Sequence, residues 1–430
     1  MHVRHDITAQ SLEKKLKAVF EYSAAKIESL QRTWKPEAGA PVFTVDGRYT
    51  SRGWTEWTQG FQFGAEILQF DATGETRFLD AGRKHTVQYM APHVSHMGVH
   101  DHGFNNISTY GNLLRLMNED VIAENDGERN FYELALKVSG AVQAARWTRT
   151  PDGGFIYSFN GPHSLFVDTI RSLRSLAVSH SLGHVLMGEN DKRIGLIDRL
   201  LQHAETTAQY AIYYGKGRDH FDVRGRVAHE SIFNVNDGNY RCPNSQQGYS
   251  PFTTWTRGLA WAMLGFAEQL EFLNDNAEMQ NTGEATCDFY IENTPSCGIP
   301  YWDTGAPNLY KLGDWRSKPA DPFNQFEPVD SSAAAIAAQG LLRLGKHLKN
   351  DRYWQAGLTV CDSLFDAPYL STNPNHQGLI LHSVYHRPNG WDGHPGESCM
   401  WGDYHARELA LYLLREIKGK PYLKFWSERK

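Results

Sequence analysis

Apolar residues recur along most of the chain at spacings of three and four, which is the period of an amphipathic α-helix. Between Leu12 and Leu30, for example, Leu16 and Val19 fall on the same face as Leu12. About twelve helices are predicted in this way, and almost no segment alternates with the period of two expected of a strand. The predicted helices cover approximately residues 12–30, 57–68, 78–89, 106–117, 131–142, 167–186, 194–214, 257–270, 277–290, 332–344, 353–365 and 404–417. Short apolar stretches such as 379–384 are expected to form only small hairpins in loops.

The connections between these helices alternate in character. Short polar turns lead into the odd-numbered helices, as at 73–78, 125–131 and 350–353, whereas long loops rich in Trp, His, Gly and Asp lead into the even-numbered ones. The chain thus repeats a helical hairpin about six times, at a longer period than solenoid repeats. We predict an all-α fold, an (α/α)6 barrel of six helical hairpins, with residues 1–430 forming a single domain. An open solenoid is the competing arrangement, but it would need polar capping repeats.

The barrel places the unusual residues of the long loops together. If the even-numbered helices form the inner ring, their N-termini converge on one mouth. The residues expected there are Trp54, Trp57, His100, Asp101, Asp168, Arg257, Trp261, Asp330 to Ser332 and Ser398 to Asp403. Helix N-termini favour anions because their backbone N–H groups are free and the helix dipole is positive there. A funnel with aromatic walls therefore suits an acidic saccharide.

The segment 247–266 shows this type of junction most clearly. A Gly- and Pro-containing loop precedes the Thr253–Thr254 pair, which is expected to cap the helix that follows. Trp255, Arg257 and Trp261 then lie at the helix start, where an arginine fork could bind an anionic ligand. The alternative is a packed helix start in which Arg257 is paired with a carboxylate of the protein.

Composition narrows the classes of partner. The chain has 12 Trp and 20 Tyr, which fits a carbohydrate cleft, whereas its net charge of −6 and the lack of a basic block argue against a nucleic-acid partner. The five cysteines are widely spaced and form no CxxC pair, a pattern typical of reduced thiols, so we expect a cytoplasmic protein. We expect no membrane partner, since the N-terminal residues contain no apolar signal region and no apolar run is long enough to span a bilayer.

Eight short motifs, spread over nearly the whole chain, occur here in the same order as in a known family of enzymes. The motifs are W-T-x-G-F at 57–61, H-D-x-G-F at 100–104, F-V-D-T at 166–169, T-W-T-R-G-x-A-W at 254–261, P-Y-W-D at 300–303, D-S-S-A-A-A-I-A-A at 330–338, H-x-V-Y-H-R-P-N-G-W at 382–391 and G-E-S-x-M-W-G-D-Y at 396–404. With them the chain resembles the unsaturated glucuronyl hydrolases, glycoside hydrolase family 88, whose fold is an (α/α)6 barrel.

The resemblance implies a function and a set of site residues. The implied enzyme releases a non-reducing-end 4,5-unsaturated uronic acid from lyase-generated oligosaccharides by hydrating the C4=C5 double bond, without a cofactor. The resemblance places the catalytic aspartates at Asp101 and Asp168. The substrate-binding positions that it implies are Trp57, His100, His229, Gln247, Arg257, Trp261, Ser398 and Trp401. The expected partner is an unsaturated uronic-acid-containing oligosaccharide, and the expected assembly is a monomer or homodimer.

One carboxyl group can donate a proton and then activate water, and we assign both steps to Asp168. Its apolar neighbours Phe166, Val167 and Ile170 are expected to raise its pKa by desolvation, so that it is protonated at rest. Asp101 would hold ring hydroxyls or the water.

Simpler roles are possible for several of these residues. Asp168 could cap its helix, His100 could be a satisfied loop histidine, and Asp330 to Ser332 most simply form a helix cap. No HExxH or paired-carboxylate set is present, so we expect no metal.

The sequence also departs from the family pattern. Gln59 stands where an acidic residue is common in the family. Arg171 and Arg174 follow Asp168 where relatives often carry a Met-Asn-Leu-Pro-like run. The two arginines could bind a carboxylate or sulfate, or they could be ion-paired within the protein. The alternative functions are an inverting glycosidase, or an enzyme similar to the unsaturated rhamnogalacturonyl hydrolases, on the same barrel and, in a different class, a non-catalytic sugar-binding protein.

Overall fold

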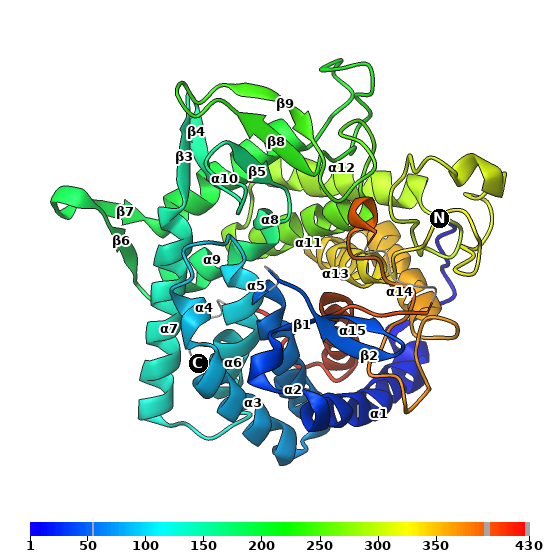
Figure 1. Cartoon of the computed structure of the whole chain (residues 1–430), viewed down its shortest axis with the longest axis horizontal. Helices are drawn as coiled ribbons and strands as arrows, with labels where there is room; N and C mark the ends of the chain where they lie inside the picture. The colour runs from blue at the N-terminus through cyan, green and yellow to red at the C-terminus, as the bar shows by residue number, and fades with distance from the viewer. Residues whose placement is uncertain (54–55, 391–395, 426–430) are drawn as a thin grey trace.

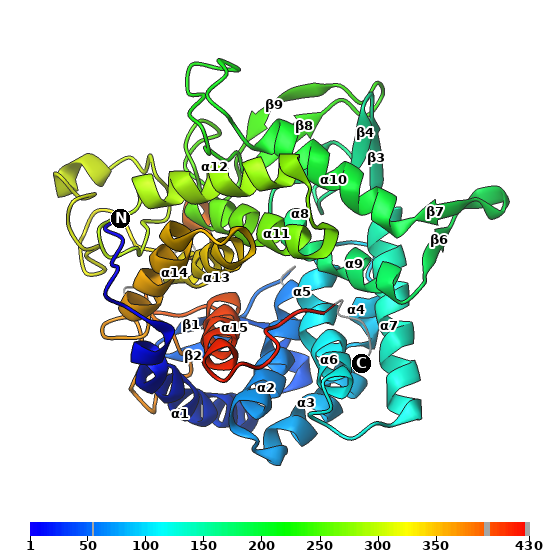
Figure 2. The same cartoon turned by 180° about the vertical axis from the view of Figure 1, so that it is seen from behind.

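The computed structural model describes residues 1–53, 56–390 and 396–425, and within them the helices form two concentric rings (Figures 1 and 2). The outer ring consists of α1 (Ala9–Thr33), α3 (Thr76–Tyr89), α7 (Asp126–Ala145), α10 (Leu196–Ala211), α12 (Ala277–Asn293) and α14 (Asp351–Leu364). The inner ring consists of α2 (Gln59–Thr73), α5 (His102–Asn106) continued by the π-helical turn η3 (Ile107–Gly111) and α6 (Asn112–Asn118), α8 (Thr169–Ser172) with α9 (Arg174–Ser181), α11 (Thr256–Leu273), α13 (Ser331–Leu348) and α15 (Met400–Ile417). A short helix, α4 (Ala91–Val94), precedes the inner α5.

The outer and inner helices differ in how much of their surface is buried. Outer helices bury one stripe, as α1 does through Leu12, Leu16 and Val19, and expose their polar face. Inner helices are buried all round, and α13 is the clearest case because its Ala-rich first half allows close approach on every side. Asp330 caps α13, accepting hydrogen bonds from the backbone N–H groups of Ser332 and Ala333, as predicted.

The inner ring closes on itself. Helix α11 packs between α8 and α13, α15 packs against both α13 and α2, and the first helix α1 also lies on α15. In Figure 1 the outer helices can be followed once around the molecule, from blue α1 to orange α14, which returns to the side of α1. The predicted (α/α)6 barrel is therefore confirmed, and the open solenoid is excluded. The single-domain assignment stays a prediction.

The loops contain more strands than the sequence indicated. The described residues form three antiparallel hairpins: β1 (Pro41–Val45) with β2 (Arg48–Ser51), β3 (Trp147–Thr150) with β4 (Gly153–Ile156), and β6 (Val185–Met187) with β7 (Arg193–Gly195). A three-stranded sheet joins β5 (Ser164–Phe166), β8 (Glu230–Phe233) and β9 (Tyr240–Asn244).

The β6–β7 hairpin corrects two predicted helix boundaries. The helix expected at 167–186 ends at Ser181 and the one expected at 194–214 begins at Leu196, because the residues between them form the β6–β7 hairpin. The stretch 379–384 forms only an isolated bridge between Leu370 and Ile380. Strands of three to five residues are too short to show a period of two.

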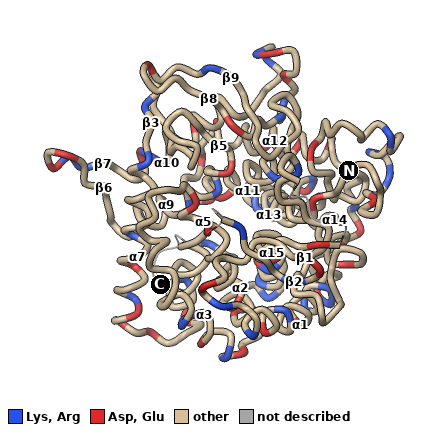
Figure 3. Tube along the Cα trace, in the orientation of Figure 1, with Lys and Arg blue, Asp and Glu red and all other residues tan. Residues whose placement is uncertain are grey.

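Charged residues of both signs are interspersed along the trace (Figure 3), in agreement with the absence of a basic block in the sequence. Of the helices in the described ranges, none has the length and apolar character needed to cross a bilayer.

Candidate active site

A cavity of about 810 Å³ opens at the ends where the inner helices begin. Seven of the expected site residues line it, namely Trp57, His100, Asp101, Asp168, Gln247, Arg257 and Trp261. Trp54 and Trp391, which belong to the same predicted mouth and motif set, lie outside the described residues. The convergence of inner-helix N-termini thus explains why residues more than 200 positions apart share one cavity.

Asp101 and Asp168 face each other across His100. Asp101 precedes α5 and Asp168 precedes α8, and neither side chain makes a capping hydrogen bond to its own helix. His100 Nε2 lies 3.0 Å from Asp168 Oδ2 and 3.7 Å from Asp101 Oδ1. The carboxylates therefore face the cavity and each other instead of stabilising their helix ends.

The charge states of this triad differ from the expectation. Burial opposes ionisation of Asp168, but the hydrogen bond and the charge of His100 outweigh it and hold the pKa of Asp168 below its ordinary value. Burial, helped by the charge of Asp168, raises the pKa of Asp101 despite the opposite pull of His100. The predicted desolvation of Asp168 is present, but the expected rise of its pKa is wrong because His100 pairs with it.

The same three side chains form the group, among the described residues, whose donor atoms lie close enough to hold a metal ion, all within 4.8 Å of one another. His100 and Asp168 are at hydrogen-bond distance, so a shared proton already satisfies that pair. The expectation of no metal and no cofactor stays a prediction.

Arg257 lies in the cavity wall but is largely engaged by the protein. One guanidinium nitrogen donates to Asp330 Oδ2 at 2.8 Å and to the Val384 carbonyl, and the other donates to the Tyr385 carbonyl at 2.6 Å. Its Cζ lies over the rings of Trp255 and Trp401, 4.6 and 4.9 Å from their centroids. The paired arrangement that the sequence left open is the one observed, while the expected cap by Thr253 or Thr254 is absent because Trp255 occupies the N-cap position.

Arg257 also orients Gln247. The second guanidinium nitrogen donates to Gln247 Oε1 at 2.7 Å, which leaves the amide Nε2 of Gln247 as a donor toward the cavity that it lines.

His229 lies directly behind this wall. Its Nδ1 accepts hydrogen bonds from the backbone N–H groups of Gln246 and Gln247, at 3.1 and 3.3 Å. Burial lowers the pKa of His229 to about 4, so the ring is neutral near pH 7 and its Nε2 carries the proton. The charge of Asp168 acts on this ring, and Nε2 has no partner within the described part of the chain.

The three tryptophans expected in the site lie at different depths in the barrel mouth. Trp57 lines the cavity and stacks on Trp401, with centroids 5.0 Å apart and planes at 28°. Trp401 is fully buried and is not part of the cavity lining, so it supports Trp57 from behind instead of facing a ligand. Trp261 lines the floor, where it packs on Phe104 and His405 at 4.9 and 5.0 Å.

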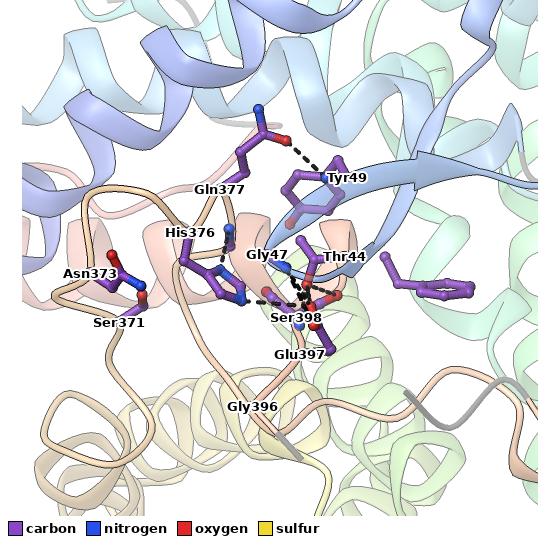
Figure 4. Close-up of polar contacts among 12 residues, drawn as sticks. Thr44, Gly47, Tyr49, Ser371, Asn373, His376, Gln377, Gly396, Glu397 and Ser398 are labelled. Carbon is purple, nitrogen blue, oxygen red and sulfur yellow. Dashed lines mark hydrogen bonds and ion pairs between the residues drawn. The ribbon is translucent and has the colours of Figure 1, made fainter. Parts of the chain in front are cut away.

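Ser398 is turned away from the cavity. Its hydroxyl donates to Asp403 Oδ1 at 2.8 Å. Its backbone N–H donates to Thr44 Oγ1 at 2.8 Å (Figure 4). Its neighbour Glu397 accepts hydrogen bonds from Thr44 and from the N–H of Gly47, which fastens this loop to the β1–β2 hairpin (Figure 4). The structure therefore gives Ser398 a role in holding the loop, not in lining the site.

Comparison with known proteins agrees with the geometry, although no family model matches the chain. An unsaturated glucuronyl hydrolase of Formosa agariphila is 24% identical over 375 residues, which cover 86% of this chain and 80% of that protein. An unsaturated glucuronyl hydrolase of a Bacillus species is 30% identical over 216 residues, 49% of this chain and 51% of that protein. The chain is a relative of the unsaturated glucuronyl hydrolases.

Solved structures of such relatives share the fold. The crystal structure of the unsaturated glucuronyl hydrolase from Bacillus sp. GL1 superposes with a TM-score of 0.75 at 22% identity, over 97% of this chain and 99% of that one. A heparin-specific unsaturated glucuronyl hydrolase gives the same TM-score at 21% identity, over 96% and 100% of the two chains. The resemblance predicted from the motifs is confirmed, and the protein is a glycoside hydrolase.

Several lining residues were not singled out from the sequence. They are Glu56, His93, His96, Phe104, Phe159, Phe166, Tyr385 and His386. Phe104, Phe166, Tyr385 and His386 lie within the unsaturated glucuronyl hydrolase motifs, so the motifs carried a signal for them. Glu56, His93, His96 and Phe159 lie in segments without a motif, and only the folded loops bring them to the cavity.

Arg171 and Arg174, by contrast, do not reach the cavity. Both are fully buried inside the barrel, where Arg171 pairs with Glu268 and Glu408 at 3.0 Å each. Arg174 lies 3.6 Å from Glu408 and donates to the Gly103 carbonyl. The ion-paired alternative is the one observed, so these arginines do not contact a ligand in the cavity.

Proposed function

We propose that the protein releases a 4,5-unsaturated uronic acid from the non-reducing end of lyase-generated oligosaccharides by hydrating the C4=C5 double bond. The observation that carries the proposal is the Asp101–His100–Asp168 cluster in an aromatic-walled cavity. The relatives support the substrate class, since they are named unsaturated glucuronyl hydrolase and, in Streptococcus pyogenes, unsaturated chondroitin disaccharide hydrolase, 22% identical over 391 residues that cover 88% of this chain and 86% of that protein.

The cavity suits such a substrate in size and polarity. Its volume lies in the range of sites that enclose a small ligand, and Trp57 and Trp261 offer apolar surfaces for a sugar ring. The Gln247 amide is a neutral hydrogen-bond donor that can bind a carboxylate. The imidazole of His229, behind the wall, is a second neutral donor. Arg257 holds Gln247 in place and, in our proposal, acts on the substrate through it.

The proposed reaction uses one carboxyl group twice. Asp168 delivers a proton to C4, and the electron-deficient C5 then takes the oxygen of a water molecule whose proton returns to Asp168. The resulting hemiketal opens to a ketone at C5 and a hemiacetal at C1. The hemiacetal then becomes an aldehyde as the neighbouring sugar leaves from C1, taking the proton of the hemiacetal hydroxyl. Asp101, which is nearly buried beside His100, would hold a ring hydroxyl or the water.

The geometry disfavours direct inverting hydrolysis. An inverting glycosidase needs its two carboxyl groups about 6.5–9.5 Å apart, so that water fits between them. Oxygen atoms of Asp101 and Asp168 lie within 4.8 Å of each other. A non-catalytic sugar-binding protein would not need two buried carboxylates with oppositely shifted pKa values, an arrangement typical of catalytic sites.

We also propose a cytoplasmic location. The five cysteines are free in the structure, as expected in a reducing compartment.

The test incubates the protein with disaccharides produced by polysaccharide lyases and follows the ultraviolet absorbance of the conjugated double bond. We expect the absorbance to fall as the neighbouring sugar is released in equal amount. Saturated glucuronides of the same linkage are the matched control and should not be cleaved. Equal cleavage of both would show a direct glycosidase, and binding without turnover of either would show a sugar-binding protein.

A further inference from the structure

Protein groups pack around the His100 side chain and hold it through Nε2, whereas its buried Nδ1 has no hydrogen-bond partner in the described part of the chain. The residue is 1% exposed, and its Nε2 lies at hydrogen-bond distance, 3.0 Å, from Asp168 Oδ2. Phe159 stacks over its ring at 6.2 Å and 15°, and Phe166 meets the ring edge-on at 5.6 Å. A residue that served only to bind a sugar hydroxyl would present its Nε2 to the cavity, but here that nitrogen is committed to a carboxylate.

The backbone of His100 is held separately from its side chain. The His100 carbonyl accepts hydrogen bonds from Gln143 Nε2 at 2.8 Å and from Ser172 Oγ at 2.7 Å. Both donors are buried, so the loop is anchored whatever side chain stands at position 100. The pairing with Asp168 is therefore not needed to fix the loop.

We propose that His100 is a positioning residue that stores the proton which Asp168 delivers, so that the two side chains act as one acid. The proposal rests on the proposed function, because it concerns the source of the proton added at C4. With one proton between them, the pair consists of an imidazolium and a carboxylate. The proton passes from Nε2 to the carboxyl group and on to C4, the attacking water returns one proton to the carboxyl group, and the pair regains its starting state.

The charged surroundings support this distribution. Burial alone would lower the pKa of His100, but the charge of Asp101 and the hydrogen bond and charge of Asp168 raise it above its ordinary value. The positive charge of Arg146 opposes them. The neighbouring His203 and His229 are neutral near pH 7, since burial lowers their pKa values to about 3 and about 4. Two carboxylates thus face one imidazole, and the imidazole keeps its proton.

The pH profile of the His100→Gln variant tests the proposal. A glutamine Nε2 can still donate to Asp168 but has no proton to release. In the wild type the alkaline limb of kcat/KM reports loss of the stored proton, whereas in the variant it reports loss of a proton from Asp168 alone. We expect the limb to move to lower pH by about one unit or more, because the ordinary pKa of an aspartic acid lies about 2.6 units below that of an imidazole. The loss of the His100 charge lets the pKa of Asp168 rise and so offsets part of this difference.

A substrate-free measurement separates this inference from the proposed function. Nitrogen-15 NMR of the histidine rings, with His100→Gln used to assign the signal, should show His100 protonated above pH 6.5. In Asp168→Asn, the amide preserves the shape but not the charge, so the His100 pKa should fall by about one unit or more. These results are independent of turnover, and they decide the question even if His100→Gln is inactive at every pH.

Three results would overturn the inference. The first is a neutral His100 at pH 6.5 in the wild type, and the second is a His100 pKa that does not change in Asp168→Asn. The third is an unchanged alkaline limb in His100→Gln together with a shifted limb in Asp101→Asn, which would make Asp101 the proton store.

Discussion

The mouth of the barrel and the buried layer of charges below it, here called the base, use the same residue types for different purposes. At the base, deep in the barrel, Arg171 and Arg174 lie among Glu268 and Glu408, and each arginine has a glutamate within 4 Å. At the mouth, two carboxylates share a single imidazole. On α11 the mouth and the base are eleven residues apart, from Arg257 to Glu268, or about 16 Å of helix.

The mouth and the base differ in the balance between their cationic and anionic side chains. The base matches cations with anions. Burial raises the pKa of Glu268 there to about 7, but Arg171 lies 3.0 Å from both Glu268 and Glu408, which leaves little for a ligand. The mouth has an excess of acceptors, and Arg257, at the start of α11, is held by Asp330. Buried groups in such an unbalanced cluster have shifted pKa values, which suits proton transfer. Substitutions at the mouth should therefore affect turnover, and substitutions at the base should affect stability.

The largest effect is expected for Asp168→Asn. The amide keeps the size of the carboxyl group but cannot pass a proton, so turnover should fall by about 10²–10⁴-fold. The unfolding midpoint should change by only a few degrees, since Asp168 caps no helix through its side chain. Steady-state kinetics and thermal unfolding measure both, and a variant with most of its wild-type rate would contradict the assignment.

Arg171→Met tests the base. Removing the guanidinium leaves Glu268 and Glu408 as buried carboxylates close to each other, and we expect a loss of about 3–5 kcal/mol in the free energy of unfolding. Urea unfolding measures this loss, while kcat/KM of the folded fraction should stay within about twofold. A large loss of activity with unchanged stability would instead show that this arginine reaches the substrate.

The smallest effect is expected for Trp57→Ala. Loss of the stacking surface should raise KM by up to about tenfold and leave kcat nearly unchanged, because no proton donor is removed. Trp315→Ala is the matched control, since this ring packs on Tyr301 and does not line the cavity. An unaltered KM for Trp57→Ala would show that the substrate ring does not lie on this tryptophan.

The same comparison explains what could be predicted from sequence. Helical period and alternating connectors are local properties, and they were sufficient for the barrel and for the convergence of Trp57, Asp101, Asp168 and Arg257 on one mouth. Pairings between distant residues were not accessible. The pKa of Asp168 depends on His100, 68 positions earlier, and the engagement of Arg257 depends on Asp330, 73 positions later.

The remaining differences between the predicted and the observed site involve residues whose orientation no local sequence pattern indicates. Ser398 has the motif context of a site residue, but its hydroxyl turns toward Asp403 on the first turn of α15. Phe159 stands outside every motif and reaches the cavity only because its loop folds over His100. Such positions depend on which way a loop turns, and no periodicity encodes that.

The most direct test of the central claim is the reaction of an unsaturated disaccharide in D2O, with NMR of the product at early times. Because hydration adds a solvent proton at C4, the wild-type product should carry a single deuterium at C4, on one face. In Asp168→Asn this product should form at least about 10²-fold more slowly. Release of the neighbouring sugar without deuterium at C4, or equal rates of deuteration in the two proteins, would contradict the mechanism.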